Sequence, residues 1–259
     1  MEKPFFEKIS KDMYTKRSAD DNWKNLILQH VDVRNKSIAD IGCGGGIYSI
    51  ALSELGAQNV IGIDQSKNML EGASGNCKEY QNIKFQNGSA TETNLKTEEV
   101  DVVLERALIH HIKEKDLINC FNEAKRILNE NGQFIIQDRT KEDCLLNGDS
   151  EHIRGYFLEF FPKLVEKDIS RRHASKTVNE SLIETGFKEV KEITFWEYRK
   201  TYYSKNELKE ELLSRNGRSL LFHLNDNELN ELANKINEKV SENFPIIEKE
   251  RWTIWIAQK

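Results

Sequence analysis

Residues 38–46 read Ile38-Ala-Asp-Ile-Gly-Cys-Gly-Gly-Gly46, and this stretch decides the fold. Ser37 to Ile41 is typical of a short buried strand, and the glycines after it predict a loop. Residues 47–55 then carry apolar side chains at helical spacing. A glycine loop between a strand and a helix lets a ligand approach the peptide groups near the positive end of the helix dipole. The stretch therefore predicts either a nucleotide-type cradle or only a tight turn.

Downstream, the chain continues as an alternation of strands and helices. Ser66 is expected to cap the helix that begins at Lys67. Strands separated by helices are typical of a parallel sheet, with the ligand edge at the carboxyl ends of its strands. Further strands are predicted over 59–63, 83–85, 100–104 and 133–137, and further helices over 23–28 and 116–128.

The regular alternation of predicted strands and helices ends after Asp138. An aromatic-rich helix over 150–168, a helix over 177–184 and a strand over 188–203 are predicted. A helical block over 204–243, interrupted near Asn216-Gly217, and a last strand over 251–257 follow. The predicted fold class is α/β: a Rossmann-like, seven-stranded, mostly parallel sheet with helices on both faces and an antiparallel edge hairpin. Helical cap insertions follow strand 5 and separate strands 6 and 7. The predicted domains are an arm or lid over 1–21, a core over 22–140, a cap with strand 6 over 141–250 and a core strand over 251–259.

Composition narrows the function class. The 259 residues include 38 Lys and Arg against 43 Asp and Glu, a net charge of −5, which disfavours nucleic acid as a partner. No apolar run reaches the roughly 18 residues of a membrane span, and the first residues do not resemble a secretory signal. The scattered cysteines Cys43, Cys77, Cys120 and Cys144 predict neither disulfides nor a metal site. We expect a cytoplasmic protein, a monomer or a homodimer, that contacts no membrane.

An acidic residue supports the nucleotide interpretation. Asp64 ends the second strand, 24 residues after Asp40, where a carboxylate can accept both hydroxyls of a ribose or can simply cap a helix. The dinucleotide fingerprint G-x-G-x-x-G fails, because Ile47 or Ser49 stands where the third glycine belongs. The phosphate-binding loop of nucleoside triphosphatases also fails, since no Gly-Lys-Ser/Thr follows. An NAD-dependent oxidoreductase is therefore disfavoured.

The spacing D-x-G-x-G-x-G that does occur resembles the first motif of the class I S-adenosylmethionine (SAM)-dependent methyltransferases. The stretches over 60–70 and 101–111 resemble the second and fourth motifs of that family, and Asn131-Gly132 resembles the step before its fifth strand. The resemblance covers about residues 20–140 and the last two strands. It is closest to the small-molecule type found in ubiquinone and menaquinone biosynthesis, and it implies SAM as cofactor and S-adenosylhomocysteine as product.

The resemblance also implies residue roles. Asp40 and the glycine-loop backbone would hold the methionine part of SAM, together with Glu105 and Arg106. Asp64 would hold the ribose, and Ser89 would stand where the family often has aspartate. The cofactor-binding residues implied in this way are Asp40, Gly42, Cys43, Gly44, Gly46, Asp64, Gln65, Met69, Ser89, Ala90, Glu105 and Arg106, with Tyr14 and Arg17 of the arm as lid residues.

Methyl transfer needs alignment more than acid–base chemistry, because the leaving thioether is neutral. If a general base is used, His110 and His111 are the candidates, with His111 favoured, since both follow the fourth strand. Packing is the other explanation for either histidine. Arg139, Arg154 and Tyr156 are the predicted substrate contacts, and the arginines of the cap favour an anionic small-molecule acceptor. Ordinary surface ion pairs are the alternative for any one of these arginines.

Two function classes stay open. The first is a small-molecule methyltransferase whose acceptor atom is oxygen, nitrogen or carbon. The second is a regulatory module that binds SAM or S-adenosylhomocysteine without transfer. The Asn/Asp-Pro-Pro-Tyr/Phe sequence of enzymes that methylate amino groups of bases is missing after the fourth strand, where Glu105-Arg106-Ala107-Leu108 stands.

Overall fold

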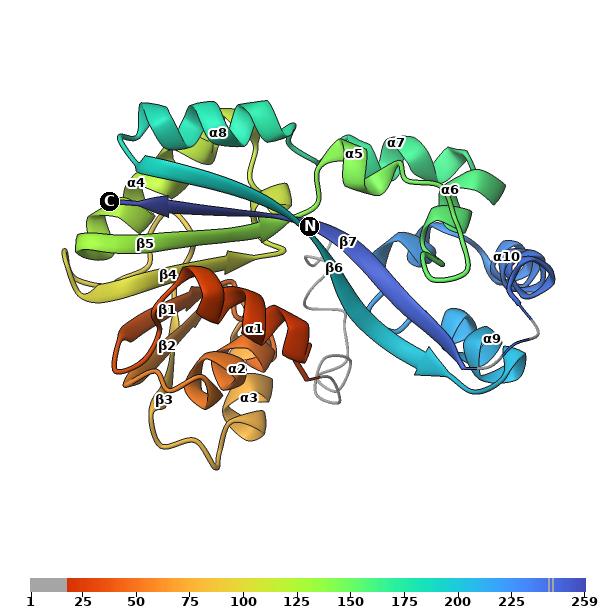
Figure 1. Cartoon of the computed structure of the whole chain (residues 1–259), viewed down its shortest axis with the longest axis horizontal. Coiled ribbons are helices and arrows are strands. Elements are labelled where there is room, and N and C mark those ends of the chain that lie inside the picture. The colour runs from red at the N-terminus through yellow and green to blue at the C-terminus, as the bar shows by residue number, and fades with distance from the viewer. Residues whose placement is uncertain (1–17, 242, 244) are drawn as a thin grey trace. The chain divides into compact units, whose positions relative to one another are not determined.

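The computed structural model describes residues 18–241, 243 and 245–259. Seven strands form one sheet in the order β3-β2-β1-β4-β5-β7-β6 (Figure 1). Strands β1 to β5 pair in parallel, and β7 joins β5 antiparallel. The predicted fold class, with its antiparallel edge pair, is therefore confirmed. The strands are β1 (Ser37–Ile41), β2 (Asn59–Asp64), β3 (Ile83–Asn87), β4 (Val100–Arg106), β5 (Leu128–Asp138), β6 (Lys188–Tyr202) and β7 (Ile246–Gln258).

Two groups of helices cover the first five strands. Figure 1 shows α1 (Asp21–His30), α2 (Ile47–Glu54) and α3 (Lys67–Asn76) near β1 to β3, and α4 (Leu117–Ile127) beside α8 (Ser175–Glu184) on the other side. The predicted start of α3 is confirmed, because the Ser66 hydroxyl accepts a hydrogen bond from the Met69 amide at 3.3 Å. Both faces of the central strands are thus buried, and their carboxyl ends stay available for a site.

The chain divides into two compact units. The core unit comprises the described part of Met1–Asp138 with Ser175–Ile193 and Thr253–Lys259, and the insert unit comprises Arg139–Ala174 and Thr194–Trp252. Each unit has its own apolar core: Phe134 packs between Phe121 and Phe187 in the core unit, with ring centroids 5.5 and 5.3 Å away. The domain boundaries predicted from the sequence stay predictions.

The insert unit corrects one sequence expectation. The single helix predicted over 150–168 is two helices, α6 (Gly155–Phe160) and α7 (Lys163–Ile169). Pro162 separates them because proline has no N–H for the hydrogen bond that a continuous helix would need there. The predicted interruption near Asn216-Gly217 is confirmed. The remaining helical segments of the unit are α5 (Lys141–Cys144), α9 (Lys205–Ser214), η5 (Ser219–His223) and α10 (Asp226–Lys239).

Among the described residues, none of the helices combines the length and the apolar character that a membrane crossing requires.

Candidate functional site

The glycine loop leaves β1 and turns back over the end of β2. Its first two amides, of Gly42 and Cys43, both donate to the Ile63 carbonyl, at 2.7 and 3.0 Å. Gly44 has a φ of +51°, and a Cβ built on it would meet nothing within 4 Å. The backbone angle thus favours glycine there, and the space beside the loop is open. Gly46 has a φ of +81° and lies against Cys77, so a side chain at this position, unlike one at Gly44, would clash.

Asp64 ties the end of β2 to this loop. One carboxylate oxygen accepts the Gly44 amide at 3.0 Å, and the other accepts the Ser66 amide at 2.8 Å. Burial raises the pKa of Asp64, while these backbone hydrogen bonds act in the opposite direction. Of the neighbouring predicted contacts, Gln65 is exposed and Met69 is buried in α3. The carboxylate is therefore fixed beside the open face of the glycine loop, as a ribose-binding residue would need to be.

Asp40 is the second carboxylate of the site and is buried. The Ser49 hydroxyl of α2 donates to it at 2.6 Å. Burial and the negative charge of Asp64 raise the pKa of Asp40, while the hydrogen bond from Ser49 and the charge of Arg106 lower it, and the resulting pKa is about 6. Two carboxylates that repel each other beside an open loop favour a cationic ligand group. The ammonium and sulfonium groups of SAM are cations of this kind, so these residues fit that cofactor.

Arg106 is supported by residues that the sequence analysis missed. Its guanidinium lies 4.0 Å from the ring centroid of Tyr48, and Trp23 packs edge-on against the same ring. The Trp23 indole in turn donates to the Gln137 side chain at 2.7 Å. The only sequence signal for this arrangement is the position of Tyr48, two residues after Gly46.

The loop after β3 carries the predicted adenine contacts. Ser89 forms a tight turn, bridging to Glu92 through the backbone and lying 3.2 Å from Thr91 between hydroxyl oxygens. Ala90 is buried and Ser89 is half-buried. Their contact with an adenine edge stays a prediction. Tyr14 and Arg17, the predicted lid residues, lie outside the described residues.

Glu105, predicted beside the methionine part of SAM, has its side chain in the protein interior. It has no exposed surface, and the Cys120 thiol of α4 donates to its carboxyl oxygens at 3.3 and 3.4 Å. Burial raises the pKa of Glu105 to about 8, and the negative charge of Asp138 adds to the rise. The side chain therefore packs against α4, and any contact of Glu105 with a cofactor is left to its backbone.

This burial predicts a pH effect on stability. Between about pH 5 and 8 the folded protein keeps the Glu105 proton and the unfolded chain releases it, so the free energy of unfolding falls by about 1.4 kcal/mol per pH unit on account of this group. We expect Glu105→Gln to remove this slope, so that its stability relative to the unsubstituted protein increases with pH in urea unfolding experiments.

Glu123→Gln is the matched control for this experiment. Burial acts to raise the pKa of Glu123, but hydrogen bonds from Arg126 and Thr93 bring it down to about 2. The contribution of Glu123 to the free energy of unfolding therefore does not change between pH 5 and 8. For Glu123→Gln, the free energy of unfolding should change with pH as it does in the unsubstituted protein. The same pH dependence in Glu105→Gln would contradict a protonated Glu105 in the folded protein.

A histidine–aspartate pair stands at the ends of β4 and β5. The Nδ1 atom of His110, in the short turn η3 (Ile109–His111), lies 2.8 and 3.0 Å from the two carboxylate oxygens of Asp138. The His110 amide also donates to Asp138, at 3.2 Å. A buried carboxylate in this position holds the proton on Nδ1 and makes Nε2 the acceptor nitrogen. His111 is exposed, with its ring 4.0 Å from that of His110.

The three predicted substrate contacts belong to the insert unit. Arg139 pairs with Glu250 and stacks over Trp252, 3.6 Å from the ring centroid. Arg154 pairs with Asp168 and is buried. Tyr156 is buried and stacks on Phe160. Contact of these residues with a substrate stays a prediction. In the described part of the chain, no group of three or more His, Cys, Asp or Glu side chains is arranged to hold a metal ion.

Known methyltransferases share part of this sequence. Residues 38–132 match the methyltransferase domain family. The chain is 31% identical over 119 residues to the uncharacterized methyltransferase YcgJ of Bacillus subtilis, covering 45% of this chain and 46% of that one. It is 33% identical over 110 residues to a ubiquinone biosynthesis O-methyltransferase of Pelagibacter ubique, covering 42% and 44%. The chain thus matches less than half the length of these curated relatives.

Solved structures share the fold over most of the chain. A putative methyltransferase from Bacillus halodurans superposes with a TM-score of 0.60 at 17% identity, covering 91% of this chain and 98% of that one. Phosphoethanolamine N-methyltransferase 2 of Haemonchus contortus, in complex with phosphomonomethylethanolamine and S-adenosylhomocysteine, also gives 0.60, at 20% identity, over 99% of this chain and 58% of that one. These structures show the shared fold. The family match over residues 38–132 and the two curated relatives confirm the resemblance to class I SAM-dependent methyltransferases that the motifs predict.

Proposed function

We propose that this chain, whose residues 38–132 match the methyltransferase domain family, binds SAM at the glycine loop and transfers its methyl group to a small-molecule acceptor. The observation that carries the proposal is the Asp64 carboxylate, which the Gly44 amide holds at the open face of the loop. Asp40 lies near enough that the charge of Asp64 raises its pKa. A solved protein of the same fold holds S-adenosylhomocysteine, which supports this choice of cofactor.

Each part of the cofactor has a partner in this proposal. The Asp64 carboxylate accepts hydrogen bonds from the ribose hydroxyls, and the Asp40 carboxylate attracts the cationic groups of the methionine part. Arg106 supplies the positive charge for the methionine carboxylate, held in place by Tyr48. Gln65, Met69, Ser89 and Ala90 are the proposed surroundings of the adenine ring.

The reaction is an in-line displacement. A lone pair of the acceptor atom forms the new bond to the methyl carbon, the carbon–sulfur bond breaks, and its electrons stay on sulfur. Bound SAM supplies the activated methyl group, and the protein aligns it with the acceptor. Where the acceptor atom carries a proton, His110 is the proposed base: Nε2 takes the proton, and Asp138 orients the ring and stabilises the imidazolium.

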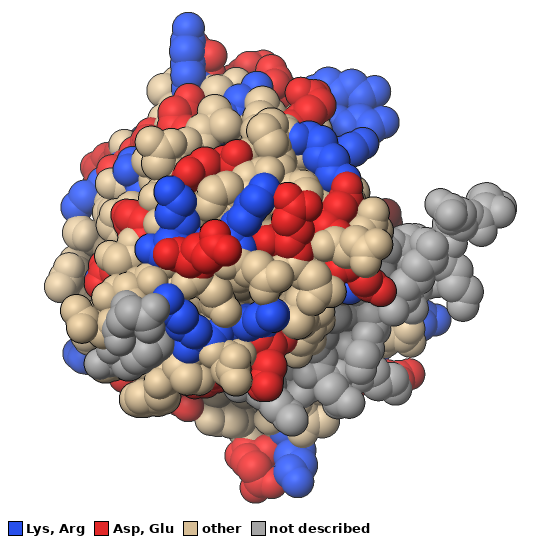
Figure 2. All heavy atoms as spheres, turned by 90° about the vertical axis from the view of Figure 1, so that its right-hand side faces the viewer, with Lys and Arg blue, Asp and Glu red and all other residues tan. Residues whose placement is uncertain are grey.

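The acceptor proposed here is a small molecule with an anionic group. Acidic and basic side chains alternate across the face shown in Figure 2 and do not gather by sign, which does not favour a nucleic-acid backbone. The arginines of the insert unit favour a carboxylate or phosphate on the acceptor. We propose no metal requirement.

Transfer of a labelled methyl group tests the proposal. The protein is incubated with SAM that carries a trideuteromethyl group and with a pool of small metabolites, and products are sought by mass spectrometry. We expect at least one metabolite to gain the labelled methyl group while S-adenosylhomocysteine accumulates. Tight SAM binding with neither product would instead favour a regulatory module without transfer activity.

A further inference from the structure

The chain folds back on itself directly after β3, and we call residues 88–95 the β3 loop. Ser89 and Glu92 exchange two backbone hydrogen bonds, at 2.9 and 3.2 Å, which makes residues 89–92 a tight turn. The amides of its two central residues, Ala90 and Thr91, take no part in the hydrogen bonds that close such a turn. The β3 loop thus offers a hydroxyl oxygen at Ser89 and a backbone N–H at the next residue.

This pair of groups matches one edge of adenine. Adenine presents an amine, which donates, beside the ring nitrogen N1, which accepts. Hypoxanthine, its deaminated counterpart, presents a carbonyl oxygen beside an N1–H group. The Ser89 hydroxyl can rotate to suit either purine, but the Ala90 amide can only donate and therefore opposes N1–H. Discrimination between the two purines thus depends on how firmly the β3 loop holds that amide in place.

The beginning of the β3 loop is tied to the end of β2. The Asn87 side chain donates to the backbone carbonyls of Asp64 and Gln65, at 3.0 and 2.9 Å. The Gly88 amide also donates to the Asp64 carbonyl, at 3.2 Å. The predicted ribose contact and the first residue of the β3 loop therefore keep a fixed relation to each other.

The far end of the β3 loop is tied to α4 through Glu123. One carboxylate oxygen of Glu123 accepts the Thr93 amide at 2.8 Å and the Thr93 hydroxyl at 2.5 Å. Thr93 is fully buried, and its carbonyl accepts a hydrogen bond from the Gln86 side chain at 2.8 Å. The same carbonyl lies so near Gly88 that a Cβ built there would be 2.7 Å from it. Thr93 is therefore fixed from both sides.

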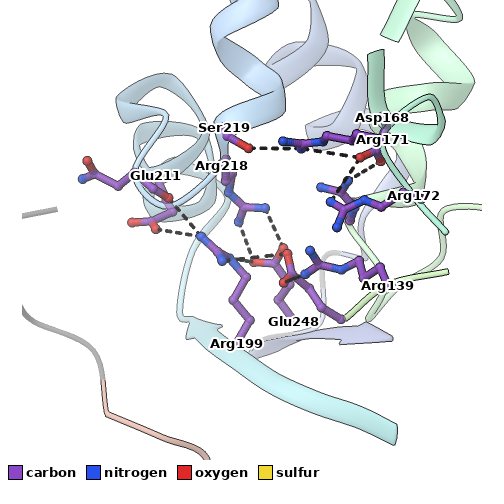
Figure 3. Close-up of polar contacts among 12 residues, drawn as sticks. Arg139, Asp168, Arg171, Arg172, Arg199, Glu211, Arg218, Ser219 and Glu248 are labelled. Carbon is purple, nitrogen blue, oxygen red and sulfur yellow. Dashed lines mark hydrogen bonds and ion pairs between the residues drawn. The ribbon is translucent and has the colours of Figure 1, made fainter. Parts of the chain in front are cut away.

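Arg126 completes this second tie. It donates to both oxygens of Glu123, at 2.7 and 2.8 Å, and to the Leu95 carbonyl at 2.8 Å. Arg218 and Glu248 of the insert unit form a pair of the same two-pronged kind, at 2.8 and 2.7 Å (Figure 3). Hydrogen bonds between ionised groups are stronger than neutral ones, so Glu123 and Arg126 make a firm anchor.

We propose that Glu123 and Arg126 are positioning residues for cofactor recognition, which hold the β3 loop in the shape in which the Ala90 amide selects adenine over other purines. The inference rests on the cofactor proposed above and adds the origin of its base specificity. Neither side chain touches the cofactor in this arrangement. Their substitution should therefore change the preference between purines, an effect that a merely structural ion pair would not have.

Calorimetric titration of the full chain with S-adenosylhomocysteine and with S-inosylhomocysteine, its deaminated analogue, tests this inference. We expect the unsubstituted protein to prefer S-adenosylhomocysteine by at least about 10-fold, because N1–H would leave two donors facing each other. Glu123→Ala and Arg126→Met should each reduce this preference by at least about 3-fold. Thr93→Val, which keeps the buried volume and removes only the hydroxyl contact, should reduce it by less.

Two control variants remove comparable contacts elsewhere. Glu54 also accepts hydrogen bonds from two other segments, from Lys24 at 2.6 Å and Tyr80 at 3.0 Å, so Glu54→Ala is the matched control within the core unit. Glu248→Gln weakens the pair with Arg218 in the insert unit and should lower the midpoint of thermal unfolding. Both variants should keep the full preference for S-adenosylhomocysteine.

The outcomes separate this inference from the proposed function. An unchanged preference in Glu123→Ala, with only a lower unfolding midpoint, would overturn the positioning role. Equal affinity of the unsubstituted protein for the two ligands would also overturn it, and would leave the proposed cofactor standing. Binding of neither ligand to the unsubstituted protein would contradict the proposed cofactor, and the positioning role would fail with it.

Discussion

Replacing Asp64 with alanine is expected to weaken SAM binding by at least about 100-fold. The ribose hydroxyls would lose two hydrogen bonds to a charged acceptor, each worth roughly 1.5–3 kcal/mol. The substitution also removes the acceptor that holds the Gly44 amide, so the glycine loop loses part of its preorganisation. Calorimetric titration with SAM and with S-adenosylhomocysteine measures the loss, and both ligands should be affected alike because they share the ribose.

Two further variants separate binding from folding. Asp32 accepts a hydrogen bond from the amide of Arg34 at 3.2 Å, with the same two-residue spacing as Asp64 and Ser66. It is exposed and precedes β1, whereas the glycine loop follows that strand. Asp32→Ala should therefore leave SAM affinity unchanged. Asp64→Asn keeps one acceptor oxygen and should fall between alanine and the original residue. Equal SAM affinity in Asp64→Ala and Asp32→Ala would refute the ribose-binding role.

Replacing His110 with alanine is expected to lower kcat by roughly 10²- to 10⁴-fold with an acceptor that must lose a proton. SAM affinity should not change, because His110 acts on the acceptor. Asp138→Asn should lower kcat as well, because the amide no longer fixes the His110 proton on Nδ1 and so no longer keeps Nε2 as the acceptor. The double variant should be no worse than His110→Ala, because the two residues act as one unit.

His111→Ala is the control for this assignment. Its ring adjoins that of His110 but is exposed, so its removal should change kcat little. The decline of kcat/KM at acidic pH that a histidine base causes should persist in His111→Ala and disappear in His110→Ala. A larger loss in His111→Ala would reverse the assignment and restore the choice that the sequence favoured.

Local patterns predicted much of the fold. The first strand was predicted with its observed bounds, 37–41, because a buried apolar run meets a glycine loop there. Helix α3 begins where the Ser66 cap indicated. Strand β5 begins at Leu128, five residues earlier than expected, since Asn131, with a φ of +62°, lies inside the strand where a turn was expected. The aromatic residues over 150–168 predict one helix, but Pro162 divides this segment into α6 and α7.

The sequence predicted only those site residues that lie close together within one motif or at the ends of neighbouring strands. Asp40 and the glycine loop are contiguous, and Asp64 ends the neighbouring strand, so spacing was enough to group them. The choice between His110 and His111 needed the position of Asp138, which another strand supplies. The packing of Trp23 against Tyr48, and the hydrogen bond from the Trp23 indole to Gln137, are contacts between distant segments. No periodicity in the sequence records such contacts.

The most direct test of the central claim is a calorimetric titration of the unmodified protein with SAM, and in parallel with NAD. We predict one-to-one binding of SAM and no binding of NAD, because the loop lacks the third glycine of the dinucleotide fingerprint while Asp40 and Asp64 offer negative charge to a cationic ligand. Binding of NAD without SAM, or binding of neither, would contradict the account of the glycine-loop site.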